Sequence, residues 1–261
     1  MKFELKQQGL ALLELLLAIE QQWTDAAQIQ QAKESWLAMA PACAEKTLTM
    51  NMLARHVDNF YRDAFFTPPL KPLLIEEMHQ PTLLSYAINQ READPLVLVL
   101  LLLCWLQQAG FESDIVRYKG EYLVQVHLSK AEKVWVDPYT GAWQCLLSPE
   151  NGLALSLTQE LATEDVNFPA FCASLWQLQK QLLLALGKRE QAMAVVQHLL
   201  EQKPGDPYLH RERGLLSELL DHWSLAISDY QYFVEQKPDD PSNDHMKQQI
   251  RQLSSYPQWL H

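Results

Sequence analysis

The last third of the chain repeats itself. The stretch LLEQKPGDP at 199–207 recurs as FVEQKPDDP at 233–241, an offset of 34 residues. Each copy ends on an Asp-Pro pair, at 206–207 and at 240–241. An aspartate followed by proline is typical of a helix start, because the aspartate caps the first amides and proline fits the first turn. A period of this length, with a helix start after each copy, restricts the region to stacked helix pairs.

Thirty-four residues is the period of tetratricopeptide repeats. When Pro204 and Pro238 are taken as the closing positions of successive repeats, several residues fall at the preferred small and large apolar positions. We expect these residues to be buried in helix-pair contacts: Trp176, Ala192, Leu199, Gly214, Ala226 and Phe233. The sequence predicts a repeat domain over 166–261, with two tetratricopeptide repeats and a C-terminal capping helix over about 241–254.

The preceding residues, 1–165, have a different pattern. Helical periodicity runs through 8–64, and a second short helix is expected over 83–90. An apolar helix then opens at Asp94-Pro95 and ends at Gly110. Strands are expected at about 112–118, 121–128 and 133–137. The fold class is therefore α+β, mostly α, with a small antiparallel sheet.

The charge and the apolar segments exclude several classes of protein. A net charge of −11 disfavours binding to nucleic acid, because phosphate backbones are repelled. The apolar run 96–106 is too short to cross a bilayer, so no membrane span is expected. Glu4 and Glu14 interrupt the N-terminal apolar stretch, so we expect no signal peptide and a cytoplasmic location.

The cysteines show no metal-binding or redox spacing. Cys43, Cys104, Cys145 and Cys172 lie far apart, with no CxxC and no Cys/His cluster. We expect buried thiols in a reducing compartment, no metal site and no cofactor.

The motif VDPYTG in the α+β domain, followed by two repeats that end in QKPDDP, resembles the bacterial SirB family. The resemblance covers nearly the whole chain and is most specific over 208–241. It implies a transglutaminase-like (papain-like) domain followed by tetratricopeptide repeats. Enzymes of the transglutaminase-like class place a cysteine at the amino end of a core helix, a histidine at the head of the next strand and an aspartate on the strand after it.

Two of these three catalytic positions are degenerate here. Asp94 opens the core helix where the family has its cysteine, and Glu121 takes the histidine position. Of the three catalytic residues of the family, only the aspartate is present, as Asp137. Cys104 is about 15 Å further along the same helix, among leucines, and His127 is about 20 Å along its strand. We therefore expect a protein without transglutaminase or protease chemistry, in which Asp94 caps the helix and Asp137 accepts hydrogen bonds from turn amides.

An alternative hypothesis keeps a residual activity. Glu121 and Asp137 would then form a carboxylate pair for acid–base or metal-assisted hydrolysis. A carboxyl separation of more than roughly 8 Å, with no bridging donor or ion, would remove this hypothesis.

The leading hypothesis is a non-catalytic protein that binds an unknown protein partner through the repeats. The expected groove positions in the second repeat are Tyr208, Arg211, Leu215 and Glu218, and in the first they are Gln177, Gln181 and Leu184. Gln177, Gln181 and Glu212 occupy the positions that clamp C-terminal carboxylates in chaperone-binding repeats, so no such clamp is expected. Two alternatives stay open: the repeats only enlarge the core, or Tyr208 and Leu215 pack beneath the first domain with Arg211 bridging to it.

The resemblance also implies a role in regulating invasion-gene expression. The chain is acidic and has no helix-turn-helix or basic helix. Any regulatory effect is therefore expected to be indirect and to pass through another protein.

Overall fold

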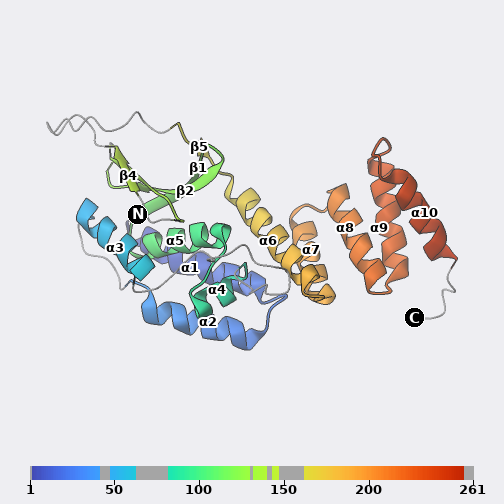
Figure 1. The fold of residues 1–261 in the computed structure, drawn as a ribbon, viewed down its shortest axis with the longest axis horizontal. Coiled ribbons are helices and arrows are strands. Elements are labelled where there is room, and N and C mark those ends of the chain that lie inside the picture. Colours follow the sequence, from blue (N-terminus) through green and yellow to red (C-terminus); the bar gives the residue numbers. More distant parts are fainter. Residues whose placement is uncertain are drawn as a thin grey trace. The chain divides into compact units, whose positions relative to one another are not determined.

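The computed structural model describes residues 2–41, 48–62, 82–129, 132–139, 143–146 and 162–255. The chain separates into two compact units, Met1–Leu175 and Trp176–His261. The described part is mostly helical and contains a small antiparallel sheet (Figure 1). None of its helices combines the length and the apolar character needed to cross a bilayer.

The first unit contains five helices and a sheet within the described residues. The helices are α1 (Lys2–Glu20), α2 (Ala26–Met39), α3 (Met50–Arg62), α4 (Leu84–Gln90) and α5 (Pro95–Gln108). The strands are β1 (Glu112–Tyr118), β2 (Glu121–His127), β3 (Lys133–Val136), β4 (Trp143–Leu146) and β5 (Glu164–Asp165). The sheet order is β4-β3-β2-β1-β5, with every pair antiparallel.

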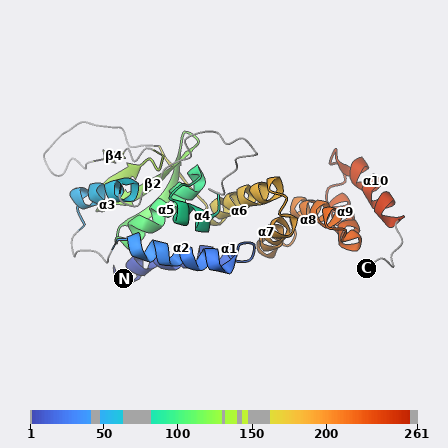
Figure 2. The same cartoon turned by 60° about the horizontal axis from the view of Figure 1, so that its bottom comes forward.

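Helix α5 is the centre of the first unit. Its residues from Val97 to Leu106 are all buried, as an apolar run of this kind predicts. It packs against α1, α3 and the strands β1 and β2, while α2 lies beside α1 and α4 (Figure 2). Gly9 allows α1 to approach closely, because a Cβ there would lie 2.6 Å from the backbone nitrogen of Gln108 and would also strike the Cys104 carbonyl oxygen.

A buried carboxylate joins the end of α1 to the start of α4. Glu20 is fully buried and accepts hydrogen bonds from the backbone amides of Leu84 and Ser85, at 2.7 and 2.9 Å. It also accepts one from the Ser85 hydroxyl at 2.6 Å. These bonds satisfy amides that a helix N-terminus otherwise leaves unpaired, which offsets the cost of burying the charge.

The three expected strands are confirmed, and two more are present. Strand β5 pairs with β1 through Val116 and Asp165, and β4 pairs with β3. Val124 and Val126 are fully buried, as alternation on β2 predicts. Gln125 lies on the opposite face of β2 and is also buried, because its side-chain oxygen accepts a hydrogen bond from Trp135 Nε1 at 3.0 Å.

The boundary between the units lies inside α6 (Phe168–Ala185). The first half of α6 belongs to the first unit, where Phe171 is buried and its ring meets Tyr122 edge-on at 5.1 Å. The expected boundary at 165 falls on β5, and the first unit extends ten residues further, to Leu175.

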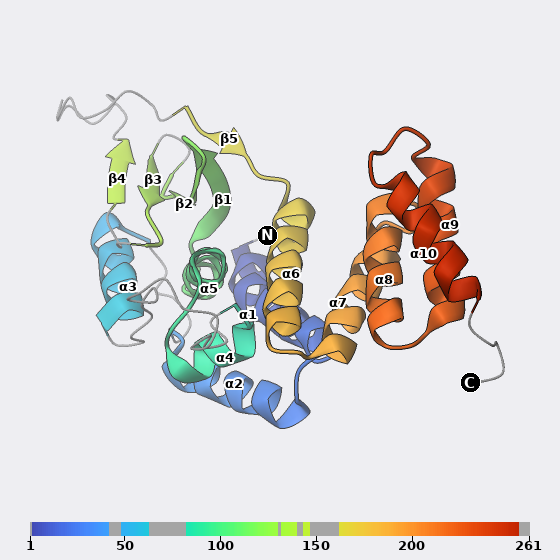
Figure 3. The same ribbon diagram turned by 45° about the vertical axis from the view of Figure 1, so that its right-hand side comes forward.

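The second unit is a stack of helices. After the second half of α6 come α7 (Arg189–Gln202), α8 (Pro207–Leu219), α9 (Trp223–Gln236) and α10 (Asn243–Ser254). Helix α9 packs against both α8 and α10 (Figure 3). The expected burial is confirmed for all six residues: Trp176, Ala192, Leu199, Gly214, Ala226 and Phe233.

One of the two expected helix starts is wrong. Asp206 caps α8 as expected, since it accepts hydrogen bonds from the amides of Tyr208 and Leu209. Asp240 does not cap α10, which begins two residues later than expected, at Asn243. Asp240 instead accepts hydrogen bonds from the amide and the hydroxyl of Ser242, at 2.9 and 2.6 Å. This local ring holds Pro241 in a turn before the helix starts.

Candidate functional site

Asp94 stands at the amino end of α5. Its side chain accepts a hydrogen bond from the amide of Leu96 at 3.0 Å, with Pro95 in the first turn, so the expected cap is confirmed. Burial raises the pKa of Asp94, and the bond from Leu96 partly opposes that rise. Asp94 is therefore a capping carboxylate at the start of a buried helix.

Asp137 and Glu121 act electrostatically on the same tyrosine as Asp94. Asp137 accepts a hydrogen bond from the amide of Tyr139 at 2.8 Å, which confirms its expected role in the turn. Burial raises the pKa of Tyr139 to about 12, and the negative charges of Glu121, Asp94 and Asp137 add to this rise. Three carboxylates that are separated in sequence thus all raise the pKa of the same tyrosine.

The chemistry of this acidic region is limited by what surrounds it. In the part of the chain that the structure describes, no group of three or more His, Cys, Asp or Glu side chains is arranged to hold a metal ion. His127 is at the far end of β2, 3.8 Å from Asp114.

The thiols of Cys104 and Cys172 are buried. Cys104 is fully buried, and its burial raises its pKa, with the nearby Cys172 contributing. Burial also raises the pKa of Cys172 to about 11. Neither thiol is an activated nucleophile, because the thiolate form is disfavoured. Cys43 lies outside the described residues, and the environment of the Cys145 side chain is not described.

The second candidate site is a surface on α8, which we call the α8 surface and define as Tyr208, Leu215 and Leu219. Their exposed fractions are 44%, 42% and 48%. The three residues are spaced by seven and four positions, so they share one helical face. Leu219 was not among the expected residues, although its spacing from Leu215 is a signal for the same face. These three side chains form the apolar part of the exposed face of α8.

Arg211 lies within the same face, but its side chain already has partners. The guanidinium lies over the rings of Tyr208 and Phe233, at 5.3 and 4.8 Å. It donates a hydrogen bond to the Ser242 hydroxyl at 3.1 Å and lies 4.0 Å from Asp240. Arg211 therefore links α8 to the turn before α10.

Two acidic residues of α8 are also paired: Glu218, which is an expected groove position, and Glu212. Glu218 accepts a hydrogen bond from the Tyr230 hydroxyl at 2.8 Å. Glu212 forms a 2.7 Å ion pair with Lys180 and accepts a longer bond from Gln177. These acids hold neighbouring helices together. The Tyr208 hydroxyl also donates a hydrogen bond to Asp240 at 3.3 Å, and the Tyr208 ring lies 5.6 Å from that of Phe233, so Tyr208 too is held within its own unit.

Gln181 and Leu184 are exposed on α6, with Leu184 less exposed than the leucines of α8. The first repeat therefore offers a polar amide and one apolar side chain at the expected groove positions.

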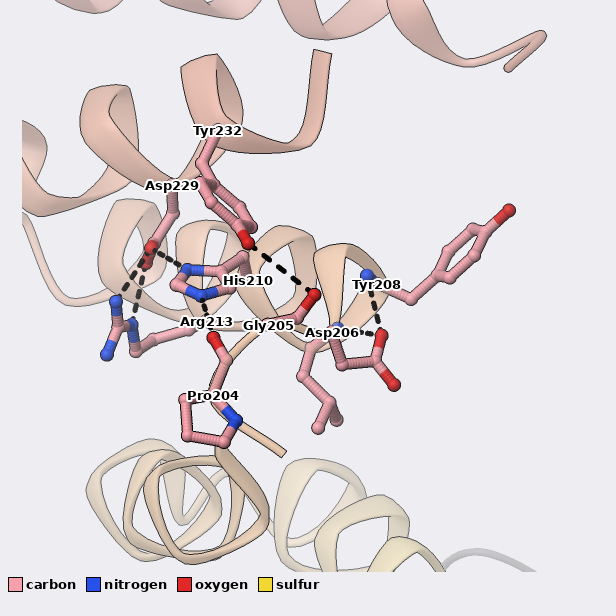
Figure 4. A network of polar contacts seen from close by, with 9 residues as sticks. Pro204, Gly205, Asp206, Tyr208, His210, Arg213, Asp229 and Tyr232 are labelled. Atoms are coloured by element: carbon pink, nitrogen blue, oxygen red, sulfur yellow. Dashed lines mark hydrogen bonds and ion pairs between the residues drawn. The ribbon is translucent and has the colours of Figure 1, made fainter. Parts of the chain in front are cut away.

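A polar network between α8 and α9 was not expected from the sequence. Asp229 is buried and accepts two hydrogen bonds from Arg213, at 2.8 and 2.7 Å (Figure 4). His210 Nδ1 lies 2.7 Å from the same carboxylate, and its Nε2 lies 2.9 Å from the Pro204 carbonyl oxygen. Tyr232 packs on the His210 ring at 4.2 Å. The network fixes the turn between the repeats against both helices.

A family model described as "Tetratricopeptide repeat" matches residues 179–251. A UPF0162 protein of Vibrio cholerae is 28% identical over 180 residues, which cover 66% of this chain and 65% of that protein. Protein SirB1 of Salmonella typhimurium is 33% identical over 82 residues, or 31% of this chain and 30% of that one. UPF0162 protein YchA of Escherichia coli K12 is 37% identical over 75 residues, or 29% and 28%.

The chain is a SirB-family protein with tetratricopeptide repeats. It spans about two thirds of the length of the Vibrio relative that it matches, with 65% covered. In this SirB-family protein the matched range 179–251 contains both Pro204 and Pro238, the positions used to set the repeat register. Tetratricopeptide repeats in such a protein are compatible with a non-catalytic interaction role.

Proposed function

We propose that this SirB-family protein acts without catalysis, by binding a partner polypeptide on the α8 surface. The observation that carries the proposal is the exposure of Tyr208, Leu215 and Leu219 on one face of a repeat helix. The neighbouring Arg211, Glu212 and Glu218 are occupied by contacts within their own unit. The surface thus offers apolar and aromatic contacts, which suit apolar side chains of an extended peptide or a helix.

The test uses a pair of substitutions that keeps the helix. In the variant Leu215→Gln/Leu219→Gln, both leucines become polar residues of good helix propensity. We expect unchanged melting temperature and loss of the proteins captured by the full chain from a native lysate, as measured by quantitative mass spectrometry. The matched control is Leu37→Gln, which alters a leucine of the first unit that is 59% exposed.

Two outcomes would contradict the proposal. One is a capture profile that the double variant leaves unchanged. The other is a fall in melting temperature, which would assign the two leucines to packing. The combination Tyr208→Ala/Arg211→Ala is less suitable, because Arg211 holds Ser242 and covers the Phe233 ring.

We further propose that the first unit is a degenerate transglutaminase-like domain. This is supported by the capping role of Asp94 at the amino end of α5 and by the convergence of Asp94, Glu121 and Asp137 around Tyr139. Purified protein is then expected to release no ammonia from glutamine donors. Iodoacetamide at neutral pH should leave Cys104 and Cys172 unmodified until urea unfolds the chain, because only the thiolate reacts. Rapid alkylation of native Cys104 would refute the assignment.

A residual hydrolase that uses Glu121 and Asp137 is the alternative proposal, and the charge convergence at Tyr139 is the observation in its favour. Hydrolysis of peptide or ester substrates that is lost in Glu121→Gln and in Asp137→Asn would support it. An effect on gene expression, in either case, would pass through a protein partner in the cytoplasm, since the net charge of −11 opposes direct contact with DNA.

A further inference from the structure

A cavity lies wholly within the first unit. Its volume is about 640 Å³, which is in the range of small-molecule sites. Its walls come from α1, α5, β1, β2, β5 and the start of α6. The apolar part of the lining includes Leu12, Leu15, Leu103, Ile115, Val116 and Phe168. Leu15 is 58% exposed, so the cavity has an apolar side chain that no part of the described chain covers.

The polar groups of the lining are acceptors. Asp114 and Asp165 contribute carboxylates, and both are exposed to solvent. The side-chain oxygen of Gln107 is buried and has no hydrogen-bond partner, while its nitrogen donates to the Ser113 carbonyl oxygen at 3.0 Å. Because that oxygen is buried, it is out of reach of a ligand in the cavity, and the carboxylates of Asp114 and Asp165 are the acceptors that a ligand meets.

The remaining polar residue of the lining is already used. Gln125 accepts from Trp135 Nε1, and its amide nitrogen faces His127 at 3.0 Å. The described lining holds no lysine, arginine or histidine. A ligand therefore meets an apolar wall and two carboxylates, of which Asp114 has the His127 ring at 3.8 Å.

We propose that this cavity binds a small organic cation, a primary amine carried on an apolar or aromatic body. The ammonium group has three donors and no acceptor, which matches the two carboxylates. The apolar body would lie against the leucines of α1 and α5. An anion of the same shape would be repelled. This site is independent of the α8 surface and of the partner proposed for it.

The test is a titration of the full chain with three probes of similar shape and different charge. They are 2-phenylethylamine, the neutral 2-phenylethanol and the anion 3-phenylpropanoate, with binding measured by ligand-observed NMR. We expect the amine to bind with a Kd of about 1 mM or tighter. The alcohol should bind about fivefold more weakly, because exposed charges contribute modestly. The anion should show no saturable binding. Added salt should weaken the binding of the amine and leave the binding of the alcohol unchanged.

Two sets of variants locate the site. Asp114→Asn/Asp165→Asn should remove the preference for the amine over the alcohol. Ala11→Phe should block all binding, because Ala11 lines the cavity and is exposed, so a ring there can enter the space without disturbing the core. Ala18→Phe is the matched control, since Ala18 is exposed on the same helix and does not line the cavity. Melting temperatures show whether each variant is folded.

The proposal is overturned if amine and alcohol bind equally well, or if the amine shows no saturable binding to the folded parent chain. It is also overturned if the double Asn variant, folded as the parent, keeps the full preference for the amine. If Ala11→Phe fails to fold, the double Asn variant decides alone.

Discussion

At the scale of single residues, Asp229 shows how the second unit tolerates a buried charge. The carboxylate is 2% exposed, and three hydrogen-bonding contacts from Arg213 and His210 reach it. The bonds to Asp229 raise the pKa of Arg213, so that its guanidinium stays charged beside the carboxylate. A buried carboxylate surrounded in this way is stable only while its partners remain.

We predict that Asp229→Asn lowers the free energy of unfolding by about 3 kcal/mol, because the Arg213 guanidinium would lose its charged partner. The measurement is urea unfolding of the full chain. Asp221→Asn is the control, since Asp221 is exposed and asparagine tolerates its positive φ of 60°. The free energy of unfolding of Asp221→Asn should stay within about 0.5 kcal/mol of the parent value. Equal shifts in the two variants would argue against the network.

Asp94 leads to a pH-dependent prediction. Burial raises its pKa above the ordinary value of 3.8, so its charged form is less favourable in the folded state than in the unfolded chain. This penalty is absent below the ordinary pKa and appears as the pH rises through it. Asparagine caps a helix as well as aspartate does. We therefore expect Asp94→Asn to raise the urea midpoint at about pH 7 and to leave it nearly unchanged at about pH 3.

The control for this prediction is the exposed cap of α2. Asp25 accepts hydrogen bonds from the amides of Ala27 and Gln28, with no burial to oppose its charge. Asp25→Asn removes a favourable charge at a helix N-terminus. The urea midpoint of this variant at about pH 7 should therefore not rise above that of the parent. A rise in both variants would mean that burial of Asp94 is not the cause.

At the scale of elements, glycines set how closely the helices approach. Gly214 lies on α8 against α9, where an added Cβ would be 2.7 Å from Cε1 of the Tyr230 ring. Tyr230 is fully buried and its hydroxyl is held by Glu218, so the ring cannot move away without cost. The close crossing of α8 and α9 therefore depends on the absence of a side chain at Gly214.

We predict that Gly214→Ala lowers the free energy of unfolding by about 1–3 kcal/mol, as overpacking of a core typically does. Gly205→Ala is the matched control in the same unit, because a Cβ there would be 3.8 Å from the Tyr232 hydroxyl, an ordinary contact. Both variants would be compared by thermal unfolding. A neutral Gly214→Ala would show that α8 and α9 can separate at this point.

At the scale of the whole molecule, α6 is shared by two units that have separate cores. Phe171 contributes to the first unit through its contact with Tyr122 on β2. Ala226 is fully buried in the second unit, in a cluster with Tyr230 and Phe233. Damage to one core is therefore expected to stay within its own unit.

We predict that Phe171→Ala costs about 3–5 kcal/mol and mainly increases hydrogen exchange of the amides in β1 and β2. Ala226→Leu is the reciprocal variant. It should cost about 1–3 kcal/mol and mainly increase exchange in α8 and α9. Exchange measured segment by segment by mass spectrometry compares the two. Equal loss of protection in both regions, in both variants, would show that the chain unfolds as one cooperative body.

The sequence by itself determined the helix pairs, three of the strands and the buried residues of the repeats. The 34-residue period, the apolar spacing and the Asp94-Pro95 cap are local features, because caps and periodicities involve residues within a few positions of one another. The same reasoning explains why Asp94 and Asp137 could be given capping and turn roles in advance.

Only the tertiary structure decided which distant groups meet. Glu20 caps a helix that begins 64 residues later, and Gly9 touches the backbone of α5. Arg211 was expected to be free for a partner, but Ser242 and the Phe233 ring hold it. Asp229 becomes a buried charge only because α9 brings it to Arg213 and His210. Such pairings depend on how complete helices pack, and short-range patterns do not encode them, because each partner alone is also compatible with a solvated surface.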